Sequence, residues 1–212
     1  VDDNSNQKTI EILKKFNKYK KIKVKFLKKN KGAAYCRNIA LKKARGNYLA
    51  FLDSDDLWNK KKLYLQYNFM KKNNFLFSYT NYQTFGTKKK IISPPSKYNF
   101  STFVYNTSIA TSSMMILKKS AQGIKFTNTK ICEDYYFKCK LLKKIKFAYC
   151  LKKNLTKYRI RNNSLQSNNL RNFYWMWHIN KNYNNFNFVK NFFSLIFISL
   201  NSIKKYHGKN FY

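Results

Sequence analysis

The sequence predicts an α/β fold in which a Rossmann-like, mostly parallel sheet is flanked by helices and followed by a helical C-terminal tail. Three observations lead to this prediction. The apolar run at residues 48–52 has the length of a strand buried on both faces, which is typical of parallel sheets. It stops at three carboxylates in a chain with eight acidic residues against 44 Lys and Arg. Helical and extended patterns alternate on either side of it.

The elements before this strand follow the same alternation. Asn4 or Ser5 can cap a helix over about residues 6–18, where apolar residues recur at near-helical spacing. Apolar residues alternate with lysines at 22–26, which predicts a half-buried strand. A turn and a helix over residues 33–44 come next. If a strand precedes Val1, the order is βαβαβ, half of a doubly wound domain with right-handed crossovers.

The elements after the carboxylates continue this pattern. Leu63, Gln66, Tyr67 and Met70 share one helical face, and that helix is expected to end at Asn73. The proline-containing stretch 84–100 is expected to be a loop. The other predicted elements are strands at 75–82, 113–117 and 147–151, a helix at 133–144, a basic strand or loop at 158–161, and helix from about residue 165.

Composition narrows the class of protein. Apolar residues make up 44% of the 212 residues, so the chain should fold as one domain with a tail. The net charge of +36 is nearly all Lys spread along the chain, which indicates a compositional bias. We therefore expect no specific nucleic-acid partner, although such a charge still favours anionic surfaces.

The cysteines and histidines form no recognisable framework. The four Cys contain no CxxC, and both His lie near the C-terminus. Neither a zinc site nor a disulfide scaffold is indicated. With no signal peptide recognised, we expect a cytoplasmic protein, either free or at the cytoplasmic face of the inner membrane.

The acidic residues are the most informative feature, because seven of the eight fall into three tight groups. These groups are Asp2-Asp3, Asp53/Asp55/Asp56 and Glu133-Asp134. We interpret them as three parts of one site. Carboxylates two residues apart after a strand are hard oxygen ligands that suit Mg²⁺ or Mn²⁺, whose shell substrate phosphates and water can complete. The simpler alternative is an Asp-rich turn that caps the next helix.

Five motifs, in their order along the chain, resemble the family 2 glycosyltransferases with the GT-A fold: VDDNS, KNKGAAYCRN, ARGNYLAFLDSDDLW, TSSMMILKKS and CEDYYFKCKLL. The resemblance runs from Val1 to about Asn168, and the spacing among the motifs is more specific than any one of them. The family's opening strand and helix are absent. The resemblance therefore implies an N-terminally incomplete GT-A domain over residues 1–168 and a helical tail over 169–212.

The resemblance also implies a donor site. In such enzymes the acid at Asp3 holds the nucleobase, usually uracil, and Arg37 lies in the motif that lines the nucleotide pocket. Asp53 and Asp55 match the DxD motif that supports Mn²⁺ or Mg²⁺ and the sugar diphosphate. A nucleotide-sugar donor, a UDP-sugar above all, is thus expected. The simpler alternatives are that Asp3 only caps the next helix and that Arg37 is a surface residue.

The remaining implied roles concern the reaction. Asp134 matches the catalytic base that takes the proton from the acceptor hydroxyl, and Arg159 or Arg161 would steady the diphosphate. The resemblance implies an inverting, metal-dependent hexosyl- or N-acetylhexosaminyl-transferase for a glycan or lipid-linked acceptor, in polysaccharide or lipopolysaccharide assembly. The simpler role for Asp134 is to complement the positive end of its helix.

The tail and the function class each leave alternatives open. Residues 173–212 are aromatic with Lys at the margins, which fits an amphipathic helix on an anionic membrane or a helical cap over the core. The apolar run 192–200 is shorter than the roughly 20 residues that a membrane span needs. The rival functions are an inactive truncated glycosyltransferase, a DxD phosphatase of the haloacid dehalogenase type and a basic nucleic-acid-binding protein.

Overall fold

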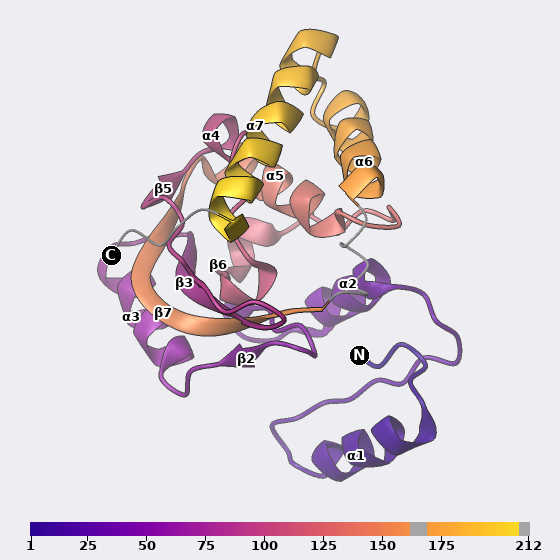
Figure 1. Ribbon diagram of the computed structural model, residues 1–212. Helices are drawn as coiled ribbons and strands as arrows, with labels where there is room; N and C mark the ends of the chain where they lie inside the picture. Colours follow the sequence, from indigo (N-terminus) through magenta and orange to yellow (C-terminus); the bar gives the residue numbers. More distant parts are fainter. Residues whose placement is uncertain (162–168, 208–212) are drawn as a thin grey trace.

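The computed structural model describes residues 1–161 and 169–207, and its centre is a curled seven-stranded sheet with helices packed against it (Figure 1). The strands follow the order β1-β6-β3-β7-β2, with β4 on β3 and β5 on β7. They are β1 (Tyr48–Ala50), β2 (Leu57–Trp58), β3 (Phe77–Gly86), β4 (Ile91–Ile92), β5 (Lys97–Tyr98), β6 (Met115–Leu117) and β7 (Ala148–Ile160).

The helices confirm most of the helical predictions. They are α1 (Gln7–Asn17), α2 (Ala33–Lys43), α3 (Lys62–Lys72), α4 (Phe100–Phe103), α5 (Glu133–Ile145), α6 (Asn169–Asn182) and α7 (Phe188–His207), with 3₁₀ turns at Thr111–Ser113 and Lys118–Ala121. The N-cap of α1 was predicted wrongly, because Asn6, not Asn4 or Ser5, accepts a hydrogen bond from the Thr9 amide at 3.0 Å. The tail prediction from residue 165 begins outside the described residues, but α6 and α7 are helical.

The α/β class is confirmed, but the pairing of the strands is not mostly parallel. Only β3 and β7 pair in parallel among the described strands, and the other five pairings are antiparallel. β6 runs between β1 and β3 in the opposite direction, so β1, β3 and β7 still share one direction. An apolar run reports burial and not strand direction, which is why the sequence pattern could not show these antiparallel neighbours.

Three predicted strands are shorter or missing. The strand predicted at 113–117 forms only as β6, because the chain up to Ser113 is a 3₁₀ turn. β1 covers only residues 48–50, and Leu52 is 47% exposed, so the run is not buried on both faces throughout. Residues 22–26 form no strand: a single parallel bridge joins Phe26 to Asp2. Ile22 is exposed and Val24 only half-buried, because no neighbouring strand covers this segment. The alternation with lysines was therefore a poor guide here.

Two strands are longer than predicted. β3 runs on to Gly86 and β7 joins the predicted strand at 147–151 to the basic stretch at 158–161. The interval 84–100 is thus not one loop, since it holds the end of β3, two short strands and the start of α4. The register of β3 and β7 shifts on both sides of Asn81, and such irregularities bend a strand. Figure 1 shows β7 curving around the sheet.

Three aromatic rings fix the two main acidic groups relative to each other. Phe51 follows β1, Phe126 precedes α5, and Phe137 lies one turn into α5. The rings of Phe126 and Phe137 stack at 4.0 Å, and Phe51 meets both edge-on at 5.7 and 5.8 Å. Phe137 is fully buried. This cluster holds the end of β1 against the start of α5, and so brings Asp53 near Glu133.

Candidate active site

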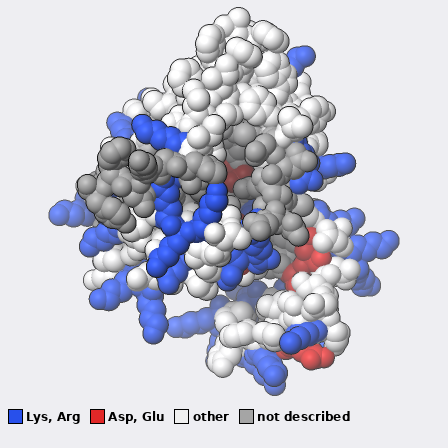
Figure 2. Space-filling view, in the orientation of Figure 1, with Lys and Arg blue, Asp and Glu red and all other residues white. Residues whose placement is uncertain are grey.

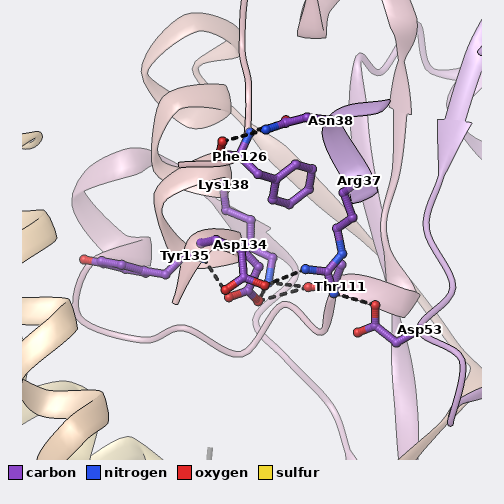
Figure 3. Close-up of polar contacts among 9 residues, drawn as sticks. Arg37, Asn38, Asp53, Thr111, Phe126, Asp134, Tyr135 and Lys138 are labelled. Carbon is purple, nitrogen blue, oxygen red and sulfur yellow. Dashed lines mark hydrogen bonds and ion pairs between the residues drawn. The ribbon is translucent and has the colours of Figure 1, made fainter. Parts of the chain in front are cut away.

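Arg37 joins the second acidic group to the third. It projects from α2 and donates from Nη2 to Asp53 Oδ1 and from Nη1 to Glu133 Oε1, both at 2.6 Å. Figure 3 shows its guanidinium between the end of β1 and α5. Burial alone would lower the pKa of Arg37, but the two carboxylates raise it above its ordinary value. The guanidinium is therefore a fixed positive charge at the centre of the site.

Asp134 is held by a different cation. Its Oδ2 accepts from Lys138 Nζ at 2.7 Å and from Thr111 Oγ1 at 2.9 Å, and Lys138 also reaches Thr111 at 3.2 Å (Figure 3). The Lys138 side chain is 4% exposed. Burial would raise the pKa of Asp134, but Lys138 and then Arg37 hold it well below its usual range. The carboxylate is thus ionised in the resting site.

Glu133, the neighbour of Asp134, responds in the opposite way. Burial, and then the negative charge of Asp134, raise the pKa of Glu133 above its ordinary value, although Arg37 opposes this. Two adjacent carboxylates therefore lie in different environments on the first turn of α5. Cys132, which precedes them, has a φ of 61° and is buried. Its left-handed conformation turns the chain sharply into α5.

The end of β7 anchors the turn that carries Asp55 and Asp56. Arg159 donates its backbone N–H to Asp56 Oδ1 at 2.8 Å and its Nε to the Asp55 carbonyl at 2.9 Å. Arg161 lies 3.4 Å from Asp55 Oδ2 and its side chain is 58% exposed. Burial raises the pKa of Asp56 to about 6. Asp56 therefore holds the turn against β7, while the side chains of Asp55 and Arg161 remain accessible to a ligand in solution.

Asp3 organises the loop that leads into α2. Its carboxylate accepts from the backbone N–H groups of Lys31 at 2.7 Å and Gly32 at 2.8 Å. Gly32 is the N-cap of α2 and has a φ of 86°, a conformation that favours glycine. Asp3 thereby positions the helix that carries Arg37. Whether it also contacts a nucleobase stays a prediction.

A cleft of about 1630 Å³ brings these groups together. Residues of the acidic site line one part of it, and α6 and α7 line another. The predicted site residues along the cleft are Arg37, Asp53, Asp55, Asp134, Arg159 and Arg161, and the Asp3 partners Lys31 and Gly32 line it as well. Six of the seven predicted residues therefore meet at one cavity, large enough for a nucleotide sugar and part of an acceptor.

The side chains of the site that could coordinate a metal suit a divalent cation only in part. Among the described residues there is no group of three or more acidic, His or Cys side chains that could hold a metal. Asp53 is engaged by Arg37, whereas the Asp55 side chain is 35% exposed. Mg²⁺ and Mn²⁺ sites are often completed by substrate phosphates, so one accessible carboxylate fits such a site.

Three polar residues of the site were not predicted. Ser112 accepts a hydrogen bond from the Asp53 amide at 3.0 Å, while Lys138 and Thr111 hold Asp134. Lys138 lies four residues after Asp134, which is the spacing of ion pairs on a helix. That signal was present in the sequence, but lysines occur at similar spacing throughout this chain.

Comparison with known proteins decides the family. The family model described as glycosyl transferase family 2 matches residues 1–145. The chain belongs to this family. The glycosyltransferase is 35% identical over 210 residues to TuaG of Bacillus subtilis, which is named as a teichuronic acid biosynthesis glycosyltransferase. That match covers 97% of this chain and 83% of TuaG.

Two further matches extend the comparison. The glycosyltransferase is 30% identical over 212 residues to WfgD of Escherichia coli, a UDP-Glc:α-D-GlcNAc-diphosphoundecaprenol β-1,3-glucosyltransferase, covering 95% of this chain and 78% of WfgD. The structure of S. aureus TarS 1-349 in complex with UDP-GlcNAc has a TM-score of 0.69 at 23% identity. The match covers 84% of this chain and about half, 54%, of that one. This likeness confirms the GT-A fold.

Proposed function

We propose that this glycosyltransferase moves a hexose or N-acetylhexosamine from a UDP-sugar to a hydroxyl of a lipid-linked or cell-surface glycan, with inversion. The observation that carries the proposal is the Arg37 bridge from Asp53 to Glu133, which joins the DxD turn to the start of α5, so that Asp53, Asp55 and Asp134 all line one cleft. WfgD, by its name, uses UDP-Glc and a diphosphoundecaprenol acceptor, and this supports a UDP donor and a lipid diphosphate acceptor here.

The donor would lie between the DxD turn and the end of β7. Asp55 would hold Mn²⁺ or Mg²⁺ together with the donor diphosphate, and the bound ion would neutralise the charge of the leaving group. Arg161 is exposed beside Asp55 and can contact the same phosphates. Arg159 is better suited to holding the turn, because its side chain already binds the Asp55 carbonyl and lies over the Phe85 ring at 4.3 Å.

The acceptor hydroxyl would approach Asp134. The Asp134 side chain is 22% exposed and lines the cleft, so an acceptor can reach it. As a carboxylate it can take the proton while the hydroxyl oxygen attacks the anomeric carbon on the side opposite the departing diphosphate. This direction of attack inverts the anomeric centre. Thr111 and Lys138 hold the carboxylate in place for that contact.

Calorimetric titration of UDP, with and without Mn²⁺, tests the donor site. We expect the dissociation constant to fall by roughly tenfold or more with Mn²⁺, and this gain to vanish in Asp55→Asn. Glu11→Gln, the exposed acid outside the three groups, is the matched control and should bind as the wild type does. Binding that ignores both the metal and Asp55 would contradict the metal assignment.

A transfer assay tests the rest of the proposal. UDP-Glc, UDP-GlcNAc and their galacto epimers are offered with a GlcNAc-diphospholipid acceptor, and the linkage of the product is read by NMR. A β-linked product from an α-linked donor is the expected result. Metal-dependent UDP binding without transfer from any donor would instead indicate an inactive member of the family.

The DxD phosphatase alternative is set aside, because the family and the fold are those of glycosyltransferases.

A further inference from the structure

Helix α7 presents its polar side to the protein and its apolar side outward. Asn191, Ser194 and Leu195 are buried against the rest of the molecule. The opposite face carries seven large apolar side chains with exposed fractions between 47% and 71%: Phe188, Val189, Phe192, Phe193, Phe197, Leu200 and Ile203. We call these seven residues the outer face of α7. A surface helix ordinarily has the reverse arrangement, with its apolar stripe toward the core.

Buried hydrogen bonds keep α7 in this orientation. The Asn180 amide of α6 donates to Asn191 Oδ1 and to Ser194 Oγ, both at 3.1 Å, and Ser194 donates to the Val104 carbonyl at 2.6 Å. Tyr135 of α5 donates to Asn180 Oδ1 at 2.7 Å. Rotating α7 to bury its outer face would leave these polar groups unpaired, which is costly. The outer face is therefore a fixed feature of the fold.

The apolar surface continues onto α6 and is bordered by positive charge. The Trp177 and Phe188 rings meet at 5.4 Å, and Tyr174 is 62% exposed. In the view of Figure 2, the end of the α6–α7 hairpin is largely free of charged side chains, while Lys and Arg gather below it. Residues 169–207 contain no Asp or Glu, and their basic residues are Arg171, Lys181, Lys190, Lys204 and Lys205. Large exposed apolar patches of this kind mark contact surfaces.

We propose that the outer face of α7 rests on an anionic lipid bilayer. Aromatic and aliphatic side chains would enter the boundary between head groups and acyl chains, and the bordering lysines would meet anionic head groups. The other side of α7 lines the cleft through Leu195 and Ile198, and Ile203, at the end of the outer face, reaches the cleft as well. The cleft would then lie beside the bilayer, where a lipid diphosphate acceptor is found; this last step rests on the proposed function.

A second copy of the chain fits this surface less well. The border of the outer face is basic, and the whole chain has a net charge of +36. Bringing two such surfaces together would place like charges side by side, whereas an anionic bilayer neutralises them. Charge complementarity therefore favours lipid over self-association.

Vesicle sedimentation in 0.5 M NaCl tests the proposal, because this salt screens the general attraction of a basic chain to anionic lipid. Wild-type protein should stay bound to vesicles of phosphatidylglycerol and phosphatidylcholine. The variant Phe192→Ser/Phe197→Ser should lose roughly tenfold or more in partition coefficient. The matched control is Phe16→Ser in α1, because Phe16 is 49% exposed and lies in another part of the fold. It should bind as the wild type does.

A second variant guards against loss of folding. In Phe197→Trp, vesicles with brominated acyl chains should quench the added tryptophan emission, whereas Phe16→Trp should show no added quenching. Equal vesicle binding by wild type and the double Ser variant, or unquenched emission from Trp placed at 197, would overturn the proposal. So would a stable dimer, seen by light scattering, that dissociates in the double Ser variant while vesicles bind neither protein. Vesicle binding without transfer activity would leave this inference standing and count only against the proposed function.

Discussion

At the scale of single residues, Asp134 is the group on which the proposed reaction depends. Asp134→Asn keeps the size of the side chain and its oxygen next to Thr111 and Lys138, but it cannot take a proton. We expect turnover to fall by about 10²–10⁴-fold while the affinity for UDP-sugar changes by less than about threefold. Single-turnover transfer and donor titration measure the two quantities separately. Turnover equal to wild type would remove Asp134 from the role of base.

Lys138 sets the protonation of Asp134. Without the lysine, only Arg37 and Thr111 would oppose the effect of burial on the pKa of Asp134, so we expect Lys138→Met to raise this pKa and to protonate the base as the pH falls. In the wild type, protonation of Asp134 should not lower the rate between pH 5 and 8, because the pKa of Asp134 lies well below that range. The variant should lose activity as the pH is lowered through it, and should recover toward pH 8.

The pH profile of kcat/KM measures this effect, with Lys140→Met on the same helix as the matched control. Lys140 lies over the Tyr136 ring and does not pair with Asp134 among the described contacts. Its replacement should leave the profile unchanged. Parallel profiles for Lys138→Met and the wild type would show that Lys138 does not govern the base.

That acidic residues far apart in the sequence meet at one cleft could be foreseen, because acids are scarce and clustered in this chain. Asp53 and Asp134 are 81 positions apart in the sequence, yet the clustering of acids around each of them suggested a single site. In the structure, Arg37 joins the two acidic groups. The partners of these acids were not predictable. Lys138 is one of many lysines, and only the fold shows that it is buried beside a carboxylate.

At the scale of elements, the parallel pair β3–β7 connects the core to the DxD turn. Gly86 ends β3 with a φ of 97°, and a Cβ there would lie 2.4 Å from the Ile160 carbonyl oxygen. Gly86→Ala should therefore lower the free energy of unfolding by about 2–4 kcal/mol, from backbone strain and the clash together. Because Arg159 and Arg161 flank Ile160, donor binding should weaken as well.

Gly123→Ala separates the two causes. Gly123 has a φ of 80°, but a Cβ there would meet no atom within 4 Å, so only the backbone strain applies, about 1–2 kcal/mol. Urea unfolding of both variants gives the comparison. Equal losses at the two glycines would mean that the end of β3 moves freely to accommodate a methyl group.

Helices were easier to predict than strands, and the reasons are local. α5 begins at paired acids and α2 follows a glycine, so both carry their own boundary signals. β7 does not, because Lys152, Lys153 and Asn154 interrupt its apolar pattern where the strand is exposed. The pattern therefore predicted two separate segments where the structure has the single strand β7. Strand direction depends on distant partners and has no local signal.

At the scale of the whole molecule, charge is distributed very unevenly. The net charge is +36, and the described residues contain four ion pairs, all of them at the acidic site. Most of the other Lys side chains are exposed, and they repel one another across the surface. A positive field around one cleft with acidic walls would draw a nucleotide diphosphate toward the protein and leave the acids to position it.

This imbalance predicts that added salt stabilises the protein. Screening weakens the repulsion among many lysines more than it weakens a few partly buried pairs, so the melting temperature should rise as NaCl increases from 0.02 to 0.3 M. Most of the rise should come below about 0.15 M, where the screening length shortens to roughly 8 Å. Calorimetry at pH 7.5 measures it. Lys21→Glu/Lys23→Glu, in an exposed segment, should flatten the dependence because it removes positive charge. A melting temperature that falls with salt would contradict this prediction. It would mean that the ion pairs around Arg37 and Asp134 stabilise the fold more than the repulsion among lysines destabilises it.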